Sequence, residues 1–203
     1  MAHSDKNIVI TPNIGSSSSD PQIVFSGADA STGPQNITLK AYPTNSGTLS
    51  FEGSAGQLFS ITNSLTGTLF SVNDISGIPS IEVLSTGVVK LAEFSGFVAY
   101  GVSPSVSAAG TTQGTATSIT RPISVVSTVT AAVSDGVIMP TATAGTRIII
   151  INTSAATLKV YPATSGQINA LGTNAAYSMS AGSRLEFIAT STTQWYTINA
   201  TFA

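Results

Sequence analysis

Apolar and polar residues alternate along several short stretches in the first half of the chain. The alternation is clearest in residues 37–42, Ile-Thr-Leu-Lys-Ala-Tyr, and in residues 48–52, Thr-Leu-Ser-Phe-Glu. This pattern is typical of a β-strand with one buried face, because successive side chains point to opposite faces. The glycine-containing segment 45–47 between them predicts a hairpin. Short apolar runs at 7–11 and 23–25 predict two further strands.

The middle of this region, residues 53–96, repeats a unit made of a strand and a turn. Leu58-Phe59-Ser60-Ile61 recurs as Leu69-Phe70-Ser71-Val72. A polar turn that ends on glycine follows each copy, at Gly67 and at Gly77. The repeat therefore predicts short strands that stack as successive rungs, with Phe59 and Ile61 on the same side as Phe70 and Val72.

Each rung is only about four or five residues long, and an isolated pair of such strands is marginally stable in water. The rungs must stack on one another within one chain, as in a solenoid, or pack against the same stretch of other subunits. In both arrangements we expect six apolar residues to pack the rungs: Leu58, Phe59, Ile61, Leu69, Phe70 and Val72.

A second β region follows in the last part of the chain. Its candidate strands recur at about the 8–12-residue spacing of a sandwich or barrel. The continuous apolar run in residues 147–152 predicts a central strand buried on both faces. No stretch has a helical period, so we expect almost no helix. The candidate strands are residues 123–129, 136–139, 147–152, 157–161, 184–189 and 195–200.

Residues 101–120 separate the two regions and consist almost entirely of Gly, Ser, Pro, Ala and Thr. This composition favours a linker, with an ordered extended crossover as the alternative. The predicted organisation is an N-terminal β region in residues 1–100, a linker in 101–120 and a C-terminal β domain in 121–203. The predicted fold is all-β, with a short-strand N-terminal region followed by a β-sandwich or barrel-like domain.

One segment occurs in both regions in closely similar form. Residues 38–47, Thr-Leu-Lys-Ala-Tyr-Pro-Thr-Asn-Ser-Gly, match residues 157–166, Thr-Leu-Lys-Val-Tyr-Pro-Ala-Thr-Ser-Gly, at seven of ten positions. The match has two explanations, a duplicated module or one favourable strand and turn used twice.

The composition narrows the classes of partner. Charged residues make up 8% of the chain and the net charge is −2, whereas an ordinary soluble domain has about 25% charged residues. Serine and threonine supply roughly 29% instead. Binding to nucleic acid needs clustered Lys and Arg, so we expect no nucleic-acid partner. No run of 18 apolar residues and no secretory signal is present, so we expect no membrane partner and synthesis in the host cytoplasm.

The search for catalytic and metal-binding residues gives no candidate. His3 is the only histidine, which excludes a Ser-His-Asp triad and histidine-rich metal sites, and the chain has no cysteine. A glycosidase needs two carboxylates roughly 5–10 Å apart, which the spacing of the nine acidic residues neither predicts nor excludes. We expect a protein with no enzyme activity, no catalytic residues, no cofactor and no metal.

Aromatic residues near the end of the chain are candidates for a sugar-binding surface. Trp195 and Tyr196 are adjacent, so on a strand one would belong to the core and the other to the surface. Tyr100, Tyr161 and Tyr177 are further candidates, and packing in a core or at its rim is the alternative for all five. We name Trp195 and Tyr196 as the candidate surface contacts for a glycan.

Several stretches resemble a known family. Residues 56–83, including Gly-Gln-Leu-Phe-Ser-Ile-Thr-Asn, look like a module of structural and fibre proteins of tailed bacteriophages, especially cyanophages. Residues 137–147, 160–171 and 194–196 resemble fibre-type β domains of the same kind, so that the resemblance covers about two thirds of the chain. It implies a homotrimer, whose N-terminal rungs are solenoid-like or intertwined between chains, and it supplies no catalytic residues.

The resemblance and the composition lead to one main hypothesis and three alternatives. The main hypothesis is a homotrimeric capsid decoration or head-fibre protein on the virion surface, bound to the major capsid protein. The first alternative is a short tail fibre or receptor-binding protein, attached to a tail or baseplate protein and touching a host surface glycan. A polysaccharide depolymerase and an unrelated adhesin are the others. We expect the 203-residue chain, which starts with Met and has no long shaft, to be complete, and this favours the head location.

Overall fold

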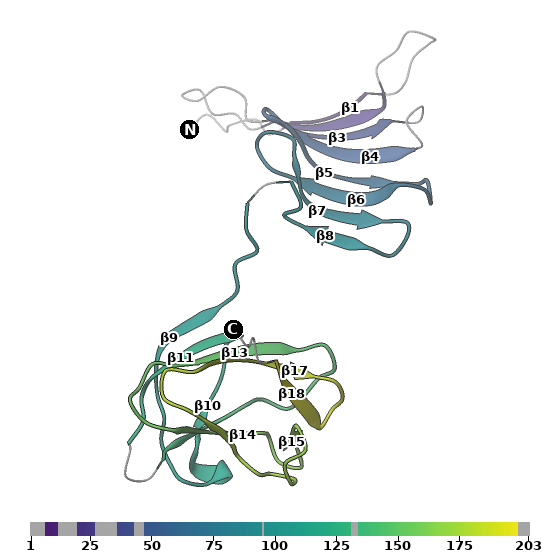
Figure 1. Cartoon of the computed structure of the whole chain (residues 1–203). Helices are drawn as coiled ribbons and strands as arrows, with labels where there is room; N and C mark the ends of the chain where they lie inside the picture. The colour runs from purple at the N-terminus through teal and green to yellow at the C-terminus, as the bar shows by residue number, and fades with distance from the viewer. Residues whose placement is uncertain are drawn as a thin grey trace, which may run out of the picture. The chain divides into compact units, whose positions relative to one another are not determined.

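The structure is a computed structural model, and it divides into two compact units, Met1–Val98 and Ala99–Ala203. It describes residues 7–11, 20–26, 36–42, 47–94, 96–130 and 134–198. The two units can be followed by colour and strand label in Figure 1, and each is considered by itself.

The first unit is an eight-stranded sheet in which every strand pairs antiparallel with the next one in the sequence. Strands this short are marginal alone, and the meander stacks them into one ladder within a single chain. This confirms the predicted short-strand region of stacked rungs. The strands are β1 (Asn7–Thr11), β2 (Gln22–Ser26), β3 (Ile37–Tyr42), β4 (Thr48–Gly53), β5 (Gly56–Thr62), β6 (Thr68–Asn73), β7 (Pro79–Leu84) and β8 (Val89–Leu91).

Glycines make the tight turns of this sheet possible. Gly67 and Gly77 have φ angles of +73° and +76°, a backbone conformation that favours glycine over residues with a Cβ atom. They end the β5–β6 and β6–β7 connections, as the repeat predicts. The predicted hairpin between β3 and β4 is confirmed by the pairing of Tyr42 with Thr48, although turn residues 43–46 lie outside the described residues.

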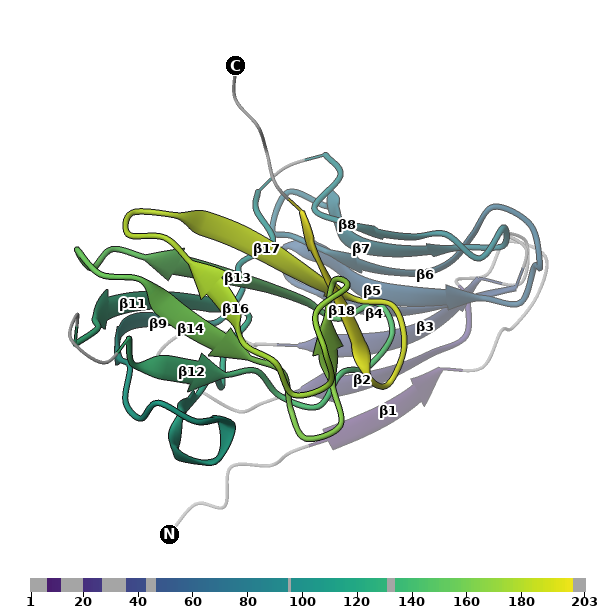
Figure 2. The ribbon, with the colours of Figure 1, turned by 60° about the horizontal axis from the view of Figure 1, so that its bottom comes forward.

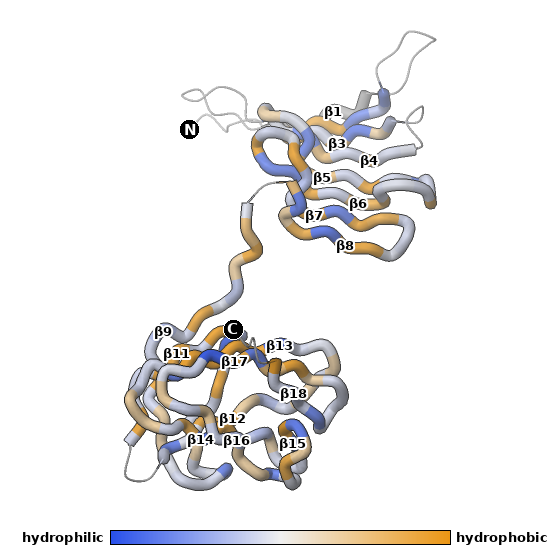
Figure 3. The backbone as a smooth tube through the Cα atoms, in the orientation of Figure 1, coloured by the Kyte–Doolittle hydropathy of each residue, from blue (hydrophilic) through white to orange (hydrophobic). Residues whose placement is uncertain are grey.

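The pairing register sorts the side chains of this sheet onto two chemically different faces. Residues opposite each other in a ladder point to the same face, so each set of paired positions forms a row across the strands. Figure 3 shows the alternation of apolar and polar residues along these strands. One apolar row contains Ile23, Leu39, Phe51, Phe59, Val72, Ile81 and Leu91. The neighbouring polar row contains Gln22, Lys40, Ser50, Ser60, Ser71, Glu82 and Lys90.

The second unit is a sandwich of a six-stranded and a four-stranded sheet, seen from two directions in Figures 1 and 2. This confirms the predicted C-terminal sandwich. The larger sheet has the order β15 (Gln167–Ile168), β18 (Gln194–Ile198), β17 (Arg184–Ala189), β13 (Arg147–Asn152), β11 (Ile123–Thr128) and β9 (Val102–Ser107). The smaller sheet has the order β10 (Thr117–Ser118), β12 (Gly136–Ile138), β14 (Leu158–Tyr161) and β16 (Tyr177–Met179).

The core of the second unit lies between these two sheets. The larger sheet contributes Phe187 and Trp195, and the smaller sheet contributes Leu158 and Met179, all of them buried. Asn152 is the polar member of this interior. Its amide nitrogen donates to the carbonyl oxygens of Ala156 and Ser180 at 2.9 and 3.0 Å, and its amide oxygen accepts from Ser154. These bonds satisfy a buried polar group that would otherwise destabilise the core.

The structure corrects two predictions about the second half of the chain. Residues 101–120 are not a plain linker, because they contain β9, β10 and the 3₁₀ turn Gln113–Thr115, and β9 and β10 pair into the sheets of the second unit. The strands are hard to recognise in the sequence because this Ser- and Thr-rich segment has few large apolar residues. The strand β13 is central in its sheet but not buried on both faces: Ile148 and Ile150 are in the core, whereas Ile149 and Ile151 are half-buried on the outer face.

Candidate functional site

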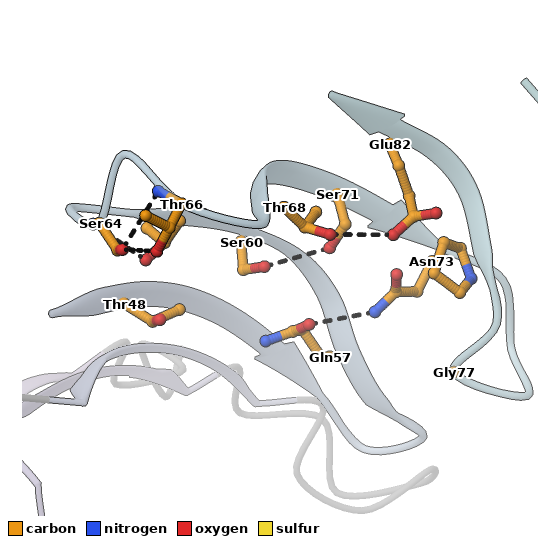
Figure 4. Close-up of a pocket in the computed structure, with 12 residues that line it drawn as sticks. Thr48, Gln57, Ser60, Ser64, Thr66, Thr68, Ser71, Asn73, Gly77 and Glu82 are labelled. Carbon is orange, nitrogen blue, oxygen red and sulfur yellow. Dashed lines mark hydrogen bonds between the residues drawn. The ribbon is translucent and has the colours of Figure 1, made fainter. Parts of the chain in front are cut away.

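A polar groove lies on the face of the first sheet that carries the serine row. It has a volume of about 430 Å³ and opens over strands β4 to β7 (Figure 4). Its described lining contains one ionisable side chain, Glu82, and is otherwise dominated by hydroxyl and amide groups. The lining residues are Thr48, Gln57, Ser60, Thr62, Ser64, Thr66, Thr68, Ser71, Asn73, Gly77, Pro79 and Glu82.

Hydrogen bonds between neighbouring strands hold the floor of the groove. The hydroxyl groups of Ser60 and Ser71 are 3.1 Å apart and bond β5 to β6. The amide nitrogen of Gln57 donates to the buried hydroxyl of Ser50 at 2.9 Å, and the amide oxygen of Gln57 accepts from Asn73 at 3.1 Å. A bulge at Leu58 separates Gln57 from Phe59 by one extra residue and turns Gln57 toward the polar face. Two separate sets of hydrogen bonds therefore cross-link strands β4, β5 and β6 at the floor of the groove.

Two acceptor groups occupy the β6–β7 end of the groove. Glu82 accepts from the Thr68 hydroxyl at 3.2 Å through one of its two carboxylate oxygens. The amide oxygen of Asn73 is buried and has no hydrogen-bond partner among the described residues. A buried acceptor left without a donor costs about 1–3 kcal/mol. This end of the groove therefore has an unmet demand for hydrogen-bond donors.

A second polar cluster on the same face lies on the neighbouring strands β3 and β4. The Tyr42 hydroxyl donates to Glu52, and the Lys40 ammonium lies 4.6 Å from the centre of the Tyr42 ring. The hydrogen bond to Glu52 and, after it, burial raise the pKa of Tyr42 above its ordinary value. The hydrogen bond with Tyr42 raises the pKa of Lys40. The folded sheet therefore favours the neutral phenol and the charged ammonium.

Glu52 and Glu82 are too far apart to act together as a hydrolytic pair. Glu52 on β4 and Glu82 on β7 are three strand spacings apart, about 14 Å, whereas a glycosidase pair is separated by roughly 5–10 Å. Among the described residues, no group of three or more His, Cys, Asp or Glu side chains could hold a metal ion. The hydroxyl and amide side chains that line the groove can form hydrogen bonds with hydroxyl groups.

The opposite face of the same sheet is apolar and largely uncovered. No apolar side chain of the first unit is buried among the described residues, and Leu58, Ile61 and Leu91 are each about half exposed. The six residues named as rung-packing residues are on this sheet. Phe59, Ile61, Phe70 and Val72 share the apolar face, Leu58 joins them over Gly53 through the bulge, and Leu69 occupies the extra position of a second bulge. The Phe51 and Phe59 rings stack with their centres 4.1 Å apart.

The two residues proposed to contact a glycan lie in different environments, one buried and one exposed. Trp195 has no exposed surface and belongs to the core, so its assignment as a surface contact is wrong. Tyr196 is 49% exposed on the outer face of the six-stranded sheet. Their adjacent positions on β18 place the two side chains on opposite faces, as the sequence predicts. Of the other tyrosines, Tyr100 is exposed and Tyr177 packs against Phe187 in the core.

The outer face of the six-stranded sheet also carries apolar residues beside a pocket of about 250 Å³. The pocket is lined by Tyr100, Pro122, Ile123 and Ile149, together with the ion pair of Arg147 and Glu186. The guanidinium of Arg147 donates to both carboxylate oxygens of Glu186, at 2.6 and 3.1 Å.

Sequence reasoning did not find the polar groove. A signal was available, because Ser50, Ser60 and Ser71 each stand between two apolar residues on successive strands. That spacing places the three serines in one row only if neighbouring strands pair in this register. The register depends on turn lengths and bulges, which the apolar pattern does not specify.

Comparisons with family models, with curated proteins and with solved structures find no match to this chain. None of the described helical segments is long and apolar enough to cross a membrane.

Proposed function

We propose that this chain is a non-enzymatic structural component of a tailed-bacteriophage virion that works as a homotrimer on the particle surface. The observation that carries the proposal is the uncovered apolar face of strands β2 to β8. The resemblance of residues 56–83 to phage structural proteins directs the proposal to a virion, and the geometry supports self-association.

The apolar face is large enough to be an interface between copies of the chain. Strands about 4.8 Å apart with about 3.3 Å per residue give each face of an eight-stranded sheet roughly 700 Å². A specific protein interface buries about 800 Å² on each partner. An apolar patch of this size is unusual on a monomer, whose largest patch measures about 300–600 Å².

The chemistry of this face favours a second copy over a charged partner. The paired rows on it contain only aliphatic and aromatic side chains, whereas Lys40, Glu52, Glu82 and Lys90 are in rows of the opposite face. A surface without charge gives no electrostatic selection of a foreign partner. An identical face is complementary to it in hydrophobicity, and closed symmetric contacts between copies are the commonest form of assembly.

The second unit supports the same proposal independently. Ile149 and Ile151 on the outer face of β13, with the exposed Tyr196 and Ile198 on β18, would be sheltered by a neighbouring copy. Within the virion we assign the chain to the head, as a decoration or head-fibre protein bound to the major capsid protein. The tail fibre, with its baseplate contact and host glycan, is the alternative location.

The assembly is tested by light scattering on the purified full chain and on the Ile61→Asp variant. Ile61 is 50% exposed on the apolar face, so an aspartate there costs little in a monomer and much in an interface. We expect three times the chain mass for the natural chain and the mass of one chain for the variant. The matched control is Ile75→Asp, the same change at a residue that is 84% exposed in the β6–β7 connection, and it should remain a trimer.

A natural chain that stays monomeric at high concentration would contradict the proposal. Location is tested by cryo-electron microscopy of particles that contain the chain. Hundreds of copies on the shell would support decoration, whereas a few trimers at the tail would exclude it and favour the fibre alternative.

A further inference from the structure

We propose that the polar groove of the first sheet binds a neutral oligosaccharide. The groove lies on the face opposite the proposed interface, and the inference does not depend on assembly. It assigns a ligand class to a surface that the sequence did not identify.

The lining is matched to sugar hydroxyl groups. A hydroxyl group donates one hydrogen bond and accepts others, and so do the side chains of Ser60 and Ser71 at the floor. The amide of Gln57 presents both a donor and an acceptor beside them. Glu82 is the one ionisable residue of the described lining, so the groove lacks the cations that a phosphate or sulfate group would need.

The array is held in place before a ligand arrives. Ser60 bonds Ser71, and Gln57 bonds both Ser50 and Asn73, so two sets of hydrogen bonds fix side chains from three neighbouring strands. Figure 4 shows Ser60, Ser71, Gln57 and Asn73 along the groove. Because their rotamers are already restricted, binding loses less side-chain entropy than it would at mobile surface serines.

The β6–β7 end explains why a donor-rich ligand is favoured. The amide oxygen of Asn73 has no described donor, and the Glu82 carboxylate has acceptor capacity beyond its bond from Thr68. Glu82 faces the groove, whereas the Asn73 amide oxygen is buried beneath its surface. A hydroxyl group of a sugar can donate to the Glu82 carboxylate. The acceptor capacity of Glu82 therefore points to a polyhydroxylated ligand and not to a second array of acceptors.

The shape favours a segment of a sugar chain. The volume of about 430 Å³ lies in the range of roughly 300–1,000 Å³ typical of ligand sites, and the groove opens along the sheet. Gly77 carries no side chain, and the space beside it at this end of the groove is open. No aromatic side chain stands in the described lining, so we expect a weak affinity for each groove, with a dissociation constant on the order of 1 mM.

The test is saturation-transfer NMR on the full chain with neutral hexasaccharides of glucose, mannose and galactose, and with dextran sulfate as the anionic probe. We expect at least one neutral hexasaccharide to bind in the millimolar range. The double variant Ser60→Ala/Ser71→Ala should weaken that binding at least tenfold, and Glu82→Gln should weaken it about threefold.

The matched control is Ser105→Ala/Ser127→Ala. These serines form the same kind of cross-strand hydroxyl pair, 2.9 Å apart, in the second unit, and the change should leave binding unaltered. The proposal is overturned if no neutral hexasaccharide binds, if the Ser60/Ser71 variant binds as well as the natural chain, or if dextran sulfate binds more tightly. Light scattering on the same samples reports assembly separately, and a Ser60/Ser71 variant that falls apart would identify the groove as a protein interface and overturn the proposal.

Discussion

The two units differ in what lies against their apolar side chains. In the second unit two sheets face each other, and Phe187, Leu158 and Trp195 are buried between them. In the first unit one sheet carries an equally regular apolar face, yet none of its described apolar side chains is buried. Both units are built from short alternating strands. Alternation of apolar and polar residues therefore creates an apolar face but does not supply the layer that covers it.

The largest expected effect tests the core of the second unit. Replacing Phe187 by alanine should destabilise this unit by about 3–5 kcal/mol, because it removes a fully buried ring and leaves a cavity. Trp195 is the chain's only tryptophan and is buried in this core, so its fluorescence during urea unfolding reports on the second unit alone. The control is Phe97→Ala, a residue that is 99% exposed, and its unfolding midpoint should hardly move. Equal effects of the two changes would contradict the comparison.

The second prediction concerns dilution of the natural chain. If copies cover the apolar face of the first sheet, hydrogen exchange of the β4–β7 amides should accelerate at least tenfold on dilution below the assembly midpoint, equivalent to about 1.4 kcal/mol. The amides of β13 and β17 should exchange at a rate that depends much less on concentration, because their core is internal. Exchange measured by mass spectrometry at several concentrations checks this. Equal protection of β4–β7 at all concentrations would mean that the single sheet is stable alone.

A smaller effect is expected at the ion pair on the outer face of the second unit. Glu186→Gln keeps the shape of the side chain and removes its charge opposite Arg147, which is 62% exposed. In an isolated unit the change should cost at most about 1 kcal/mol, because exposed pairs contribute little. Thermal unfolding followed by Trp195 fluorescence checks this. A larger loss, accompanied by dissociation in light scattering, would place the pair inside an interface and extend the proposed assembly to the second unit.

The smallest effect is a pH dependence confined to the first unit. The raised pKa of Tyr42 means that its stabilising contribution is complete below the ordinary value of 10.0 and is lost as the pH rises through the raised value. Urea unfolding followed by circular dichroism should therefore show a slightly less stable first sheet at pH 11 than at pH 9. Tyr42→Phe removes the titrating hydroxyl and should reduce this difference, whereas Trp195 fluorescence provides the comparison in the second unit. A stability that rises with pH in this range would have the wrong sign.

Much of the fold was predictable because it depends on local sequence. Alternation predicted strands at 37–42 and 48–52, and the glycines at 67 and 77 predicted the turns between rungs. The strand at 147–152 was predicted with its observed bounds, but the prediction that both its faces are buried was wrong, because its outer face is only half-buried. The strands β9 and β10 were missed, since their Ser- and Thr-rich segment has the composition of a linker. Their pairing partners lie elsewhere in the chain, and local composition does not report them.

The repeated segment separates what sequence and tertiary structure each decide. In both copies the sequence determines a strand, β3 in the first unit and β14 in the second. The tertiary structure determines the hydrogen-bond partner of the tyrosine in each copy. Tyr42 donates to the Glu52 carboxylate, whereas Tyr161 donates to the carbonyl oxygen of Thr111 at 2.6 Å. Strand formation depends on neighbouring residues, whereas covering a face, aligning serines into a groove and burying Trp195 depend on register and on distant segments.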